Sequence, residues 1–435
     1  MPPRTSNPPT TAEPLPADAS PPDADPVPPR RGWQLLTDRV FGAFFAGKLV
    51  STIGVWVHNI AAAILVFELT GSALLVGAVT VGQFVPQLVI TPFSGAQADR
   101  GDRRRQVIVG RLVAASGSGL LVLWSLIVGL EGRAGAGAVI VAATIVGVGF
   151  ALGGPAMSAL VPSLVRREEL ASAIALSASP FTIARVAGPA IGAVLVATAG
   201  ATTAFLVATV TNLAFAAVLW RLPIPTTARR TGRETSIGAG LRYVRSDAAM
   251  LGLLVGIAAI GVGADPVITL TPSMAADLGQ DAGFVGVLAS SFGLGAAGAF
   301  LVLGVLRRWL GLERLGVAGM LTLATGLVGF AAASAPGPAV VAAVVGGIGL
   351  TTALTSLTTI VQQRVPDELR GRVMALWSMA FLGSRPLAAG TTGAVADAAS
   401  VTVALGLSIA VVLAGAVVVG RSRVSPAAAQ PSRGT

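Results

Sequence analysis

Apolar stretches of about twenty residues recur along this chain of 435 residues, and short polar loops separate them. A helix of about twenty apolar residues is long enough to cross the ~30 Å hydrocarbon core of a bilayer. Strands of membrane barrels are about ten residues long and alternate apolar with polar side chains. The stretches found here are longer and uniformly apolar, and a lipid-exposed helix satisfies its own backbone hydrogen bonds. The sequence therefore predicts an all-α integral membrane protein.

The composition excludes several other classes of protein. Only 11% of the residues are charged and the mean hydropathy is +0.78, whereas soluble domains carry roughly 25% charged residues. The chain has no cysteine, which excludes disulfides, thiolate metal sites and cysteine nucleophiles. A single histidine, His58, argues against a histidine metal centre or a catalytic triad. We therefore expect no metal, no cofactor and no enzymatic activity.

Twelve spans are expected, and the loops between them alternate in charge. The expected spans lie near residues 41–67, 73–96, 107–130, 138–160, 173–198, 202–220, 250–272, 284–306, 315–334, 339–360, 373–396 and 401–420. One set of loops carries nearly all the basic residues: Arg100, Arg103, Arg104, Arg105, Arg166, Arg167, Arg221, Arg229, Arg230, Arg233, Arg242, Arg245, Arg307, Arg308, Arg314, Arg364, Arg370, Arg372, Arg421 and Arg423. The other set carries Glu68, Glu131, Asp277, Asp281 and Asp397, with Arg133 as its single basic residue.

This alternation predicts the orientation, because loops rich in Lys and Arg stay in the cytoplasm. The basic loops and both termini are expected to be cytoplasmic, in a multi-pass protein of the plasma (inner) membrane. The net charge of +10 is also compatible with a nucleic-acid-binding protein, but the arginines are confined to short loops between spans. We therefore expect the lipid bilayer, and not nucleic acid, as the macromolecular partner.

The longest polar break in the membrane part, residues 221–249, divides the chain into two halves. We expect an N-terminal six-helix bundle at 38–220 and a C-terminal six-helix bundle at 250–420. The Pro-rich segment 1–37 and residues 421–435 are predicted to be cytoplasmic tails, the first of them disordered. Within the break, residues 236–245 place apolar side chains at helical spacing beside two arginines. That pattern predicts an amphipathic helix on the membrane surface, and a plain linker is the alternative.

The two halves contain a similar passage about 200 residues apart. Each copy has an acidic loop motif, then an apolar triplet, then an arginine after eight further residues: 167–170, 174–176 and Arg185 in the first, and 366–369, 374–376 and Arg385 in the second. A parallel repeat that relates two six-helix halves is typical of one transporter architecture. The repeat therefore predicts two bundles with the same internal arrangement.

The turn between the second and third expected spans carries a dense group of charges around a glycine, at residues 95–105. An acid among several arginines can form ion pairs in one conformation and release them in another. Here the sequence resembles the major facilitator superfamily, whose loop signature G-x-L-x-D-R-x-G-R-R it matches at Gly95, Asp99, Arg100, Arg103 and Arg104. The form D-R-x-D-R-R is similar to the drug-exporter branch related to macrolide and siderophore exporters. The resemblance covers residues 38–420.

The resemblance implies the major facilitator fold and a carrier that moves a small-molecule substrate by alternating access. In that family the loop acid opposes the N-terminus of a helix in the other half. Asp99 would then face the eleventh span, which we expect to begin near Val373. Anchoring of the loop arginines to anionic headgroups is the alternative. The chain is expected to act as a monomer.

The fifth expected span contains small residues around a proline, at Gly188, Pro189 and Gly192, next to Arg185. Glycines permit close helix contact in lipid and proline removes one helical hydrogen bond, so ordinary packing with a kink is one interpretation. The resemblance implies another. The family's antiporter motif G-x-x-x-G-P-x-x-G-G, associated with exporters, matches at these three residues, with alanine in place of two of its glycines.

Ionisable side chains within spans are costly in lipid and are therefore functional candidates. Asp265, beside Pro266, is the only acid expected deep in a span. A buried carboxyl group can load and release a proton, and a structural pair with Arg185 or Arg385 is the alternative. His58 is the second candidate for proton coupling, for which interhelical hydrogen bonding is the alternative.

Other polar residues are candidates for lining a cavity, namely Asn59, Gln83, Gln87, Asn212 and Arg385. The fourth expected span, 138–160, lacks the arginine present in many proton-coupled drug exporters of the resembling family. The chain has no P-loop for a nucleotide, so the proton gradient is the expected energy source.

These features together predict proton-coupled efflux of small amphipathic compounds, such as a drug, a siderophore or a secondary metabolite. Such an antiporter would contribute to multidrug resistance. One alternative is an importer of a nutrient or metabolite with the same fold. Another is a membrane sensor or scaffold that transports nothing and uses the Pro-rich tail.

Overall fold

The computed structural model describes residues 32–224 and 237–422, and every regular element in these two ranges is helical. Most of the predicted N-terminal tail, the middle of the predicted linker and most of the predicted C-terminal tail lie outside the described residues. The first range contains α1 (Gly32–Leu35), α2 (Phe41–Thr70), α3 (Ala73–Arg100), α4 (Arg103–Ile127), α5 (Gly132–Leu160), the 3-10 turns η1 (Val161–Ser163) and η2 (Arg167–Glu169), and α6 (Leu170–Arg221). The second contains α7 (Ile237–Ser246), α8 (Ala248–Ala264), α9 (Pro266–Thr269), α10 (Thr271–Asp277), α11 (Ala282–Ala332), α12 (Pro336–Arg364), α13 (Asp367–Ala398) and α14 (Val401–Arg421).

Nine helices within the described ranges are long and apolar enough to cross a membrane. Two of them, α6 and α11, contain 52 and 51 residues and bend at Gly200 and Gly311, where φ is 80° and 73°. Such a backbone conformation is readily adopted only by glycine. At 1.5 Å per residue each helix is roughly 75 Å long, more than twice the hydrocarbon thickness, so each supplies two spans. Together with the 32-residue α13, the helices account for the twelve predicted spans.

Side chains fix the point at which five of the long helices begin. Ser72, Asp102, Asp247, Asp281 and Ser400 each accept a hydrogen bond from a backbone N–H in the first turn of the helix that follows. These caps satisfy donors that have no partner inside the helix. The cap residues are polar positions at the ends of the apolar stretches, which explains why the sequence pattern located the spans.

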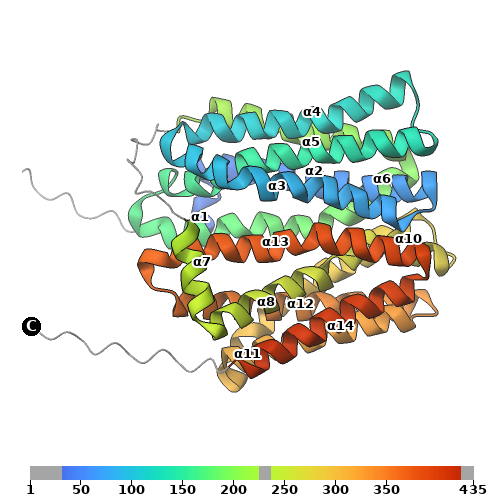
Figure 1. Ribbon diagram of the computed structural model, residues 1–435. Coiled ribbons are helices and arrows are strands. Elements are labelled where there is room, and N and C mark those ends of the chain that lie inside the picture. Colours follow the sequence, from blue (N-terminus) through green and yellow to red (C-terminus); the bar gives the residue numbers. More distant parts are fainter. Residues whose placement is uncertain (1–31, 225–236, 423–435) are drawn as a thin grey trace, which may run out of the picture.

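Each half packs as a bundle of its own, and two pairs of helices join the halves. In the first half α2 packs on α6, and α4 packs on α5 and α6; in the second half α11 packs on α12 and α14, and α8 packs on α13 and α14. The halves meet where α3 lies against α13 and where α6 lies against α11. In Figure 1, α3 and α13 run near the middle of the molecule, with α4 and α5 on one side and α8, α12 and α14 on the other.

Glycines allow the helices of each half to approach closely. A Cβ atom on Gly110 of α4 would lie 2.6 Å from the carbonyl oxygen of Gly149 in α5, and one on Gly326 of α11 would lie 2.5 Å from Cα of Gly346 in α12. Without a hydrophobic driving force between helices in lipid, such close backbone contact stabilises association. Both halves use the same device between their third and fourth spans.

The two ends of the helix bundle differ in charge. We call one the basic end, where the arginine-rich loops lie, and the other the acidic end, where Glu68, Glu131, Asp277, Asp281 and Asp397 lie. Helix α7 crosses the basic end at a steep angle to the long helices (Figure 1) and packs on α8 and α13. Val244 of α7 is buried, and its Arg242 and Arg245 are exposed.

Candidate functional site

The two helix pairs that join the halves are packed tightly at the acidic end and separate toward the basic end. On α13, a Cβ atom at Gly393 would lie 2.6 Å from the carbonyl oxygen of Ala73 in α3, whereas one at Gly371 would meet nothing within 4 Å. On α11, a Cβ atom at Gly286 would lie 2.8 Å from the carbonyl oxygen of Pro189 in α6, whereas Gly304 has open space. Along these two helix pairs, the close backbone contacts between the halves therefore lie toward the acidic end.

Asp397 holds α3 and α13 together at the acidic end. Its carboxylate accepts hydrogen bonds from the hydroxyl of Ser72 at 2.5 Å, from the backbone N–H of Ala73 at 2.7 Å and from that of Leu74 at 3.3 Å. These donors form the N-terminus of α3, where the helix dipole also favours a negative charge. The sequence marked Asp397 only as a loop acid, because this role depends on a helix more than 300 positions away.

The predicted charged loop at the basic end splits into two groups of side chains. Arg103 donates to the carbonyl oxygens of Ala98 at 3.0 Å and Ala159 at 3.3 Å, and Arg104 donates to that of Leu219 at 2.8 Å and to that of Trp220. These arginines bind C-terminal carbonyl groups of helices within the first half, where cations are favourable.

The remaining members of that loop are free of such contacts. Gly95 is partly buried, while Asp99 and Arg100 are exposed, and neither charged side chain has a hydrogen-bond or ion-pair partner in the described part of the chain. The helix that contains the expected eleventh span, α13, begins at Asp367, six residues before Val373. In the second copy of the repeat, residues 367–369 of the acidic motif form the first turn of α13.

Two arginines reach across the boundary between the halves. The guanidinium carbon of Arg185, on α6, lies 5.2 Å from the ring centre of Phe292 on α11. That of Arg385, on α13, lies 4.4 Å from the ring centre of Phe84 on α3. Because α6 begins at Leu170, Arg185 lies about 22 Å along the helix at 1.5 Å per residue. Both arginines therefore sit in the middle of the membrane part.

Asp265 is completely buried and lies near Arg385, one member of this pair. It stands between α8 and α9, where Pro266 starts a new turn of helix. One carboxylate oxygen accepts a hydrogen bond from Thr269 at 2.8 Å, and the other has no partner in the described residues. Asp265 interacts electrostatically with Arg385, although no ion pair within 4.0 Å joins them in the described ranges.

The predicted antiporter motif lies on the side of α6 that faces α2. A Cβ atom on Gly192 would lie 3.1 Å from Cα of Val57, and Gly188 is in contact with the side chain of Trp56. The Pro189 carbonyl lies against Gly286 of α11, as described above. The motif therefore lets α6 approach a helix of its own half and a helix of the other half at once.

The other predicted candidates lie in the interior of the first half. His58 is buried, its Nδ1 lies 3.1 Å from the hydroxyl oxygen of Ser118, and its ring packs edge-on against Phe205. Gln83 donates to the side-chain oxygen of Asn59 at 2.9 Å, and Gln87 donates to the backbone oxygen of Gln83 at 3.2 Å. The contacts of His58 and of Gln83 with Asn59 join helices of one half, the Gln87 contact lies within α3, and none of them reaches Asp265.

Arg111 is a buried cation that the sequence interpretation overlooked. It is 4% exposed and donates to the hydroxyl of Ser51 at 3.2 Å and to the side-chain oxygen of Asn212 at 3.4 Å. Its guanidinium group stacks on Phe150 at 4.7 Å, and Lys48 lies close enough to interact electrostatically. The signal was available, because Arg111 is the one charged residue inside the third predicted span.

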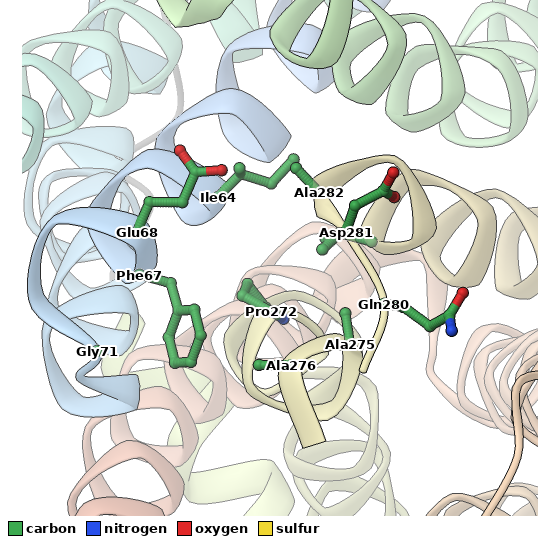
Figure 2. Close-up of a pocket in the computed structure, with 11 residues that line it drawn as sticks. Ile64, Phe67, Glu68, Gly71, Pro272, Ala275, Ala276, Gln280, Asp281 and Ala282 are labelled. Atoms are coloured by element: carbon green, nitrogen blue, oxygen red, sulfur yellow. The ribbon is translucent and has the colours of Figure 1, made fainter. Parts of the chain in front are cut away.

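A pocket of about 450 Å³ opens at the acidic end between α2, α10 and the start of α11. Figure 2 shows Glu68 of α2 and Asp281, the residue that caps α11, on its two sides. The pocket is separate from the arginine pair and has the opposite charge. No group of three potential metal ligands was found in the part of the chain that the structure describes.

Comparison with known proteins gives a consistent result. A family model described as "Transmembrane secretion effector" matches residues 31–434. The chain is 28% identical over 363 residues to the enterobactin exporter EntS of Shigella boydii, covering 79% of this chain and 82% of that protein. It is 29% identical over 155 residues to the macrolide efflux protein A of Streptococcus pyogenes, but that match spans only 37% of the relative and 36% of this chain.

Solved structures show the same fold at low sequence identity. A bacterial homologue of the iron transporter ferroportin, in an inward-facing state, has a TM-score of 0.71 at 16% identity, covering 88% of this chain and 98% of that one. A bacterial homologue of the lysosomal transporter Spinster, also inward-facing, has a TM-score of 0.70 at 14% identity, covering 91% and 99%.

Proposed function

Because the chain belongs to the transmembrane secretion effector family of the major facilitator superfamily, we propose that it exports small amphipathic compounds by alternating access. The family consists of multi-pass membrane transporters and not of enzymes. In the proposed cycle the two six-helix halves of a single chain rock about the central residues, so that the site opens to one side of the membrane at a time. A monomer is sufficient for this cycle, since both halves lie in one chain.

The observation that carries the proposal is the unequal contact between α3 and α13. Asp397 closes the acidic end by binding the N-terminus of α3, while Asp99 at the other end of α3 is exposed. A transporter needs two such closures that form in alternation. A protein that serves only as a scaffold needs neither.

Three points support export as the direction of transport. The basic loops favour a cytoplasmic position for the basic end, in an inner membrane with both termini inside, so the separated end faces the cytoplasm and the cargo. The Gly188–Pro189 segment resembles the antiporter motif of exporters. The two relatives named above are an exporter and an efflux protein.

We propose that proton movement drives export and that Asp265 carries the proton. A fully buried carboxyl group at the boundary of the halves, with one oxygen unpartnered, is costly to keep ionised and is therefore easily protonated. His58 is less suitable, because it lies inside the first half. Asp265 is the group that a change of conformation can expose first to one side and then to the other.

Accumulation of a panel of amphipathic compounds in expressing and non-expressing cells tests the direction. Export predicts lower accumulation in expressing cells, and higher accumulation would show import and contradict the proposal. In everted vesicles, Asp265→Asn should abolish export driven by an imposed pH gradient, whereas Glu131→Gln, which removes an exposed acid, should not. Undiminished transport by Asp265→Asn would contradict the proton-carrying role.

A further inference from the structure

The two boundary arginines form a pseudo-symmetric pair. Arg185 and Arg385 are the equivalent residues of the internal repeat, and each stacks on a phenylalanine of the opposite half. Phe84 lies on the second span of the first half, and Phe292 lies on the second span of the second half. The structure thus brings two guanidinium groups and two aromatic rings together, with each half contributing one of each.

The pair carries more positive charge than the surrounding side chains neutralise. The two guanidinium groups interact with each other electrostatically, and Asp265 is the carboxylate that interacts with Arg385. In the described ranges neither guanidinium group takes part in a hydrogen bond or ion pair, and Nε of Arg385 is buried without a partner. Two cations and one carboxylate in the middle of a membrane protein favour a further anion.

Arg111, another buried arginine of this protein, has hydrogen-bond partners that the boundary pair lacks, although its Nε, like that of Arg385, is buried without a partner in the described residues. It donates to Ser51 and Asn212 and lies within a single half. Arg185 and Arg385 lack such partners and lie between the halves. The difference indicates that the boundary arginines are kept available for a ligand.

We propose that Arg185 and Arg385 together bind a negatively charged group of the transported molecule, and that a planar aromatic part of that molecule packs against Phe84 and Phe292. The proposal rests on the transport function proposed above and names the chemical class of the cargo, an amphipathic aromatic anion. The forked N–H donors of arginine match the paired oxygens of a carboxylate, phosphate or sulfonate. The phenylalanine rings supply apolar surface next to those donors.

The position of the pair suits a site that opens to one end at a time. A Cβ atom at Gly293 of α11 would lie 3.0 Å from Cα of Val186, next to Arg185, while one at Gly298 would meet nothing within 4 Å. On the other helix pair, α3 and α13, a Cβ atom at Gly383 of α13 would lie 3.1 Å from the side chain of Leu88 in α3. A Cβ atom at Gly371 would meet nothing within 4 Å. The arginines therefore lie on the basic side of the close contacts that join the two helix pairs at the acidic end.

The charge count also relates the cargo to the energy source. Two arginines and an ionised Asp265 together carry one positive charge, so a monovalent anion makes the loaded site neutral. The empty carrier returns with a net positive charge, and a membrane potential that is negative inside favours that return. The electrical part of the proton gradient would then drive export alongside the proton on Asp265.

Equilibrium dialysis of the purified full-length protein against labelled 2-naphthoate tests the proposal, with uncharged 2-naphthamide as the matched probe. Wild-type protein should bind naphthoate about tenfold more tightly than naphthamide, because charge-assisted hydrogen bonds are the stronger ones. Arg185→Gln and Arg385→Gln should each weaken naphthoate binding by about tenfold and leave naphthamide binding unchanged. Arg221→Gln, which removes an exposed arginine at the end of α6, should change neither.

Asp265→Asn supplies a readout that a purely structural role would not give. Removing the competing carboxylate should tighten naphthoate binding several-fold. If the glutamine variants do not fold, the naphthoate affinity of Asp265→Asn tests the proposal by itself. Equal affinity for the two probes, unchanged naphthoate binding in folded glutamine variants, or weaker binding in Asp265→Asn would overturn the proposal. Failure of the export function would look different, with binding as predicted but no efflux from cells.

Discussion

Each end of the α3–α13 pair has an aspartate at the C-terminus of one helix, but only one of the two aspartates binds the other helix. Asp99 and Asp397 are each the penultimate residue of their helix, and the two helices run antiparallel. Asp397 binds the N-terminus of α3, whereas Asp99, at the opposite end, points to no partner in the described residues. A carboxylate at the end of one helix thus closes the gap to the beginning of the other at the acidic end, and we expect Asp99 to do the same at the basic end in the alternate state.

Small energies are enough to control the balance between two such states. A carboxylate at a helix N-terminus contributes roughly 0.3–1 kcal/mol when exposed and up to about 2 kcal/mol in favourable geometry. Since about 1.4 kcal/mol changes an equilibrium tenfold, one such contact is enough to bias two states of similar stability. The chain has no cysteine, so spin labels on introduced cysteines can follow each end separately.

The largest expected effect comes from filling the tight contact at the acidic end. Gly393→Ala places a methyl group against the Ala73 carbonyl and should cost about 1–3 kcal/mol, as overpacking does. Labels at Glu131 and Ser334, in loops of the two halves at the acidic end, should move apart. Gly371→Ala on the same helix has open space and serves as the matched control. The same distance between the labels in Gly393→Ala and Gly371→Ala would contradict the tight packing at the acidic end.

The next effect concerns the two carboxylates themselves. Asp397→Asn removes the charge but keeps the shape of the side chain, and should shift the population toward separation at the acidic end by a factor of about ten. Asp99→Asn should leave the acidic-end distance unchanged or shortened, because Asp99 has no contact to lose in this state. An identical shift in both variants would mean that the two ends are not distinguished by these contacts.

A smaller effect is expected from the loop arginines, which act within one half. Arg104→Gln loses the hydrogen bonds to the Leu219 and Trp220 carbonyls and should lower the free energy of unfolding by about 1 kcal/mol. The label distances should not move. The exposed Arg100→Gln is the control, and thermal unfolding measures both. A distance change in Arg104→Gln would assign the arginine to the switch instead.

The smallest effect concerns Asp247, which pairs with Arg364 at 2.9 Å at the basic end of the second half. Burial raises the pKa of Asp247, but hydrogen bonds from Arg364 and from the amides of Met250 and Ala249 outweigh it, and the pKa lies below its ordinary value. The stabilisation is therefore present above the pKa of the unfolded chain and is lost as the pH falls through the lowered value.

Asp247→Asn keeps the helix cap, since asparagine caps as well as aspartate, and removes only the ion pair. Unfolding at neutral pH should become easier by less than about 1 kcal/mol, and the difference from wild type should vanish in acid. A difference that persists in acid would show that the ion pair is not its source.

The spans and the repeat could be predicted from the sequence because each is a local pattern. Apolar stretches located the helices, and the spacing before Arg185 and Arg385 identified two equivalent residues. Asp397 and the phenylalanine partners could not be found in that way, since their contacts join segments far apart in the chain. The sequence places His58 beside Asp265 as a proton-coupling candidate and Asn212 beside Arg385 as a cavity candidate, because a span prediction gives depth but not the face of the helix.

Distance measurements on two label pairs in one experiment test the central claim most directly. The pair at Glu131 and Ser334 reports the acidic end, and a pair at Gln97 and Glu368 reports the basic end. Alternation predicts that Asp397→Asn lengthens the acidic-end distance and shortens the basic-end distance in the same fraction of molecules. A longer distance at the acidic end with an unchanged distance at the basic end would contradict it.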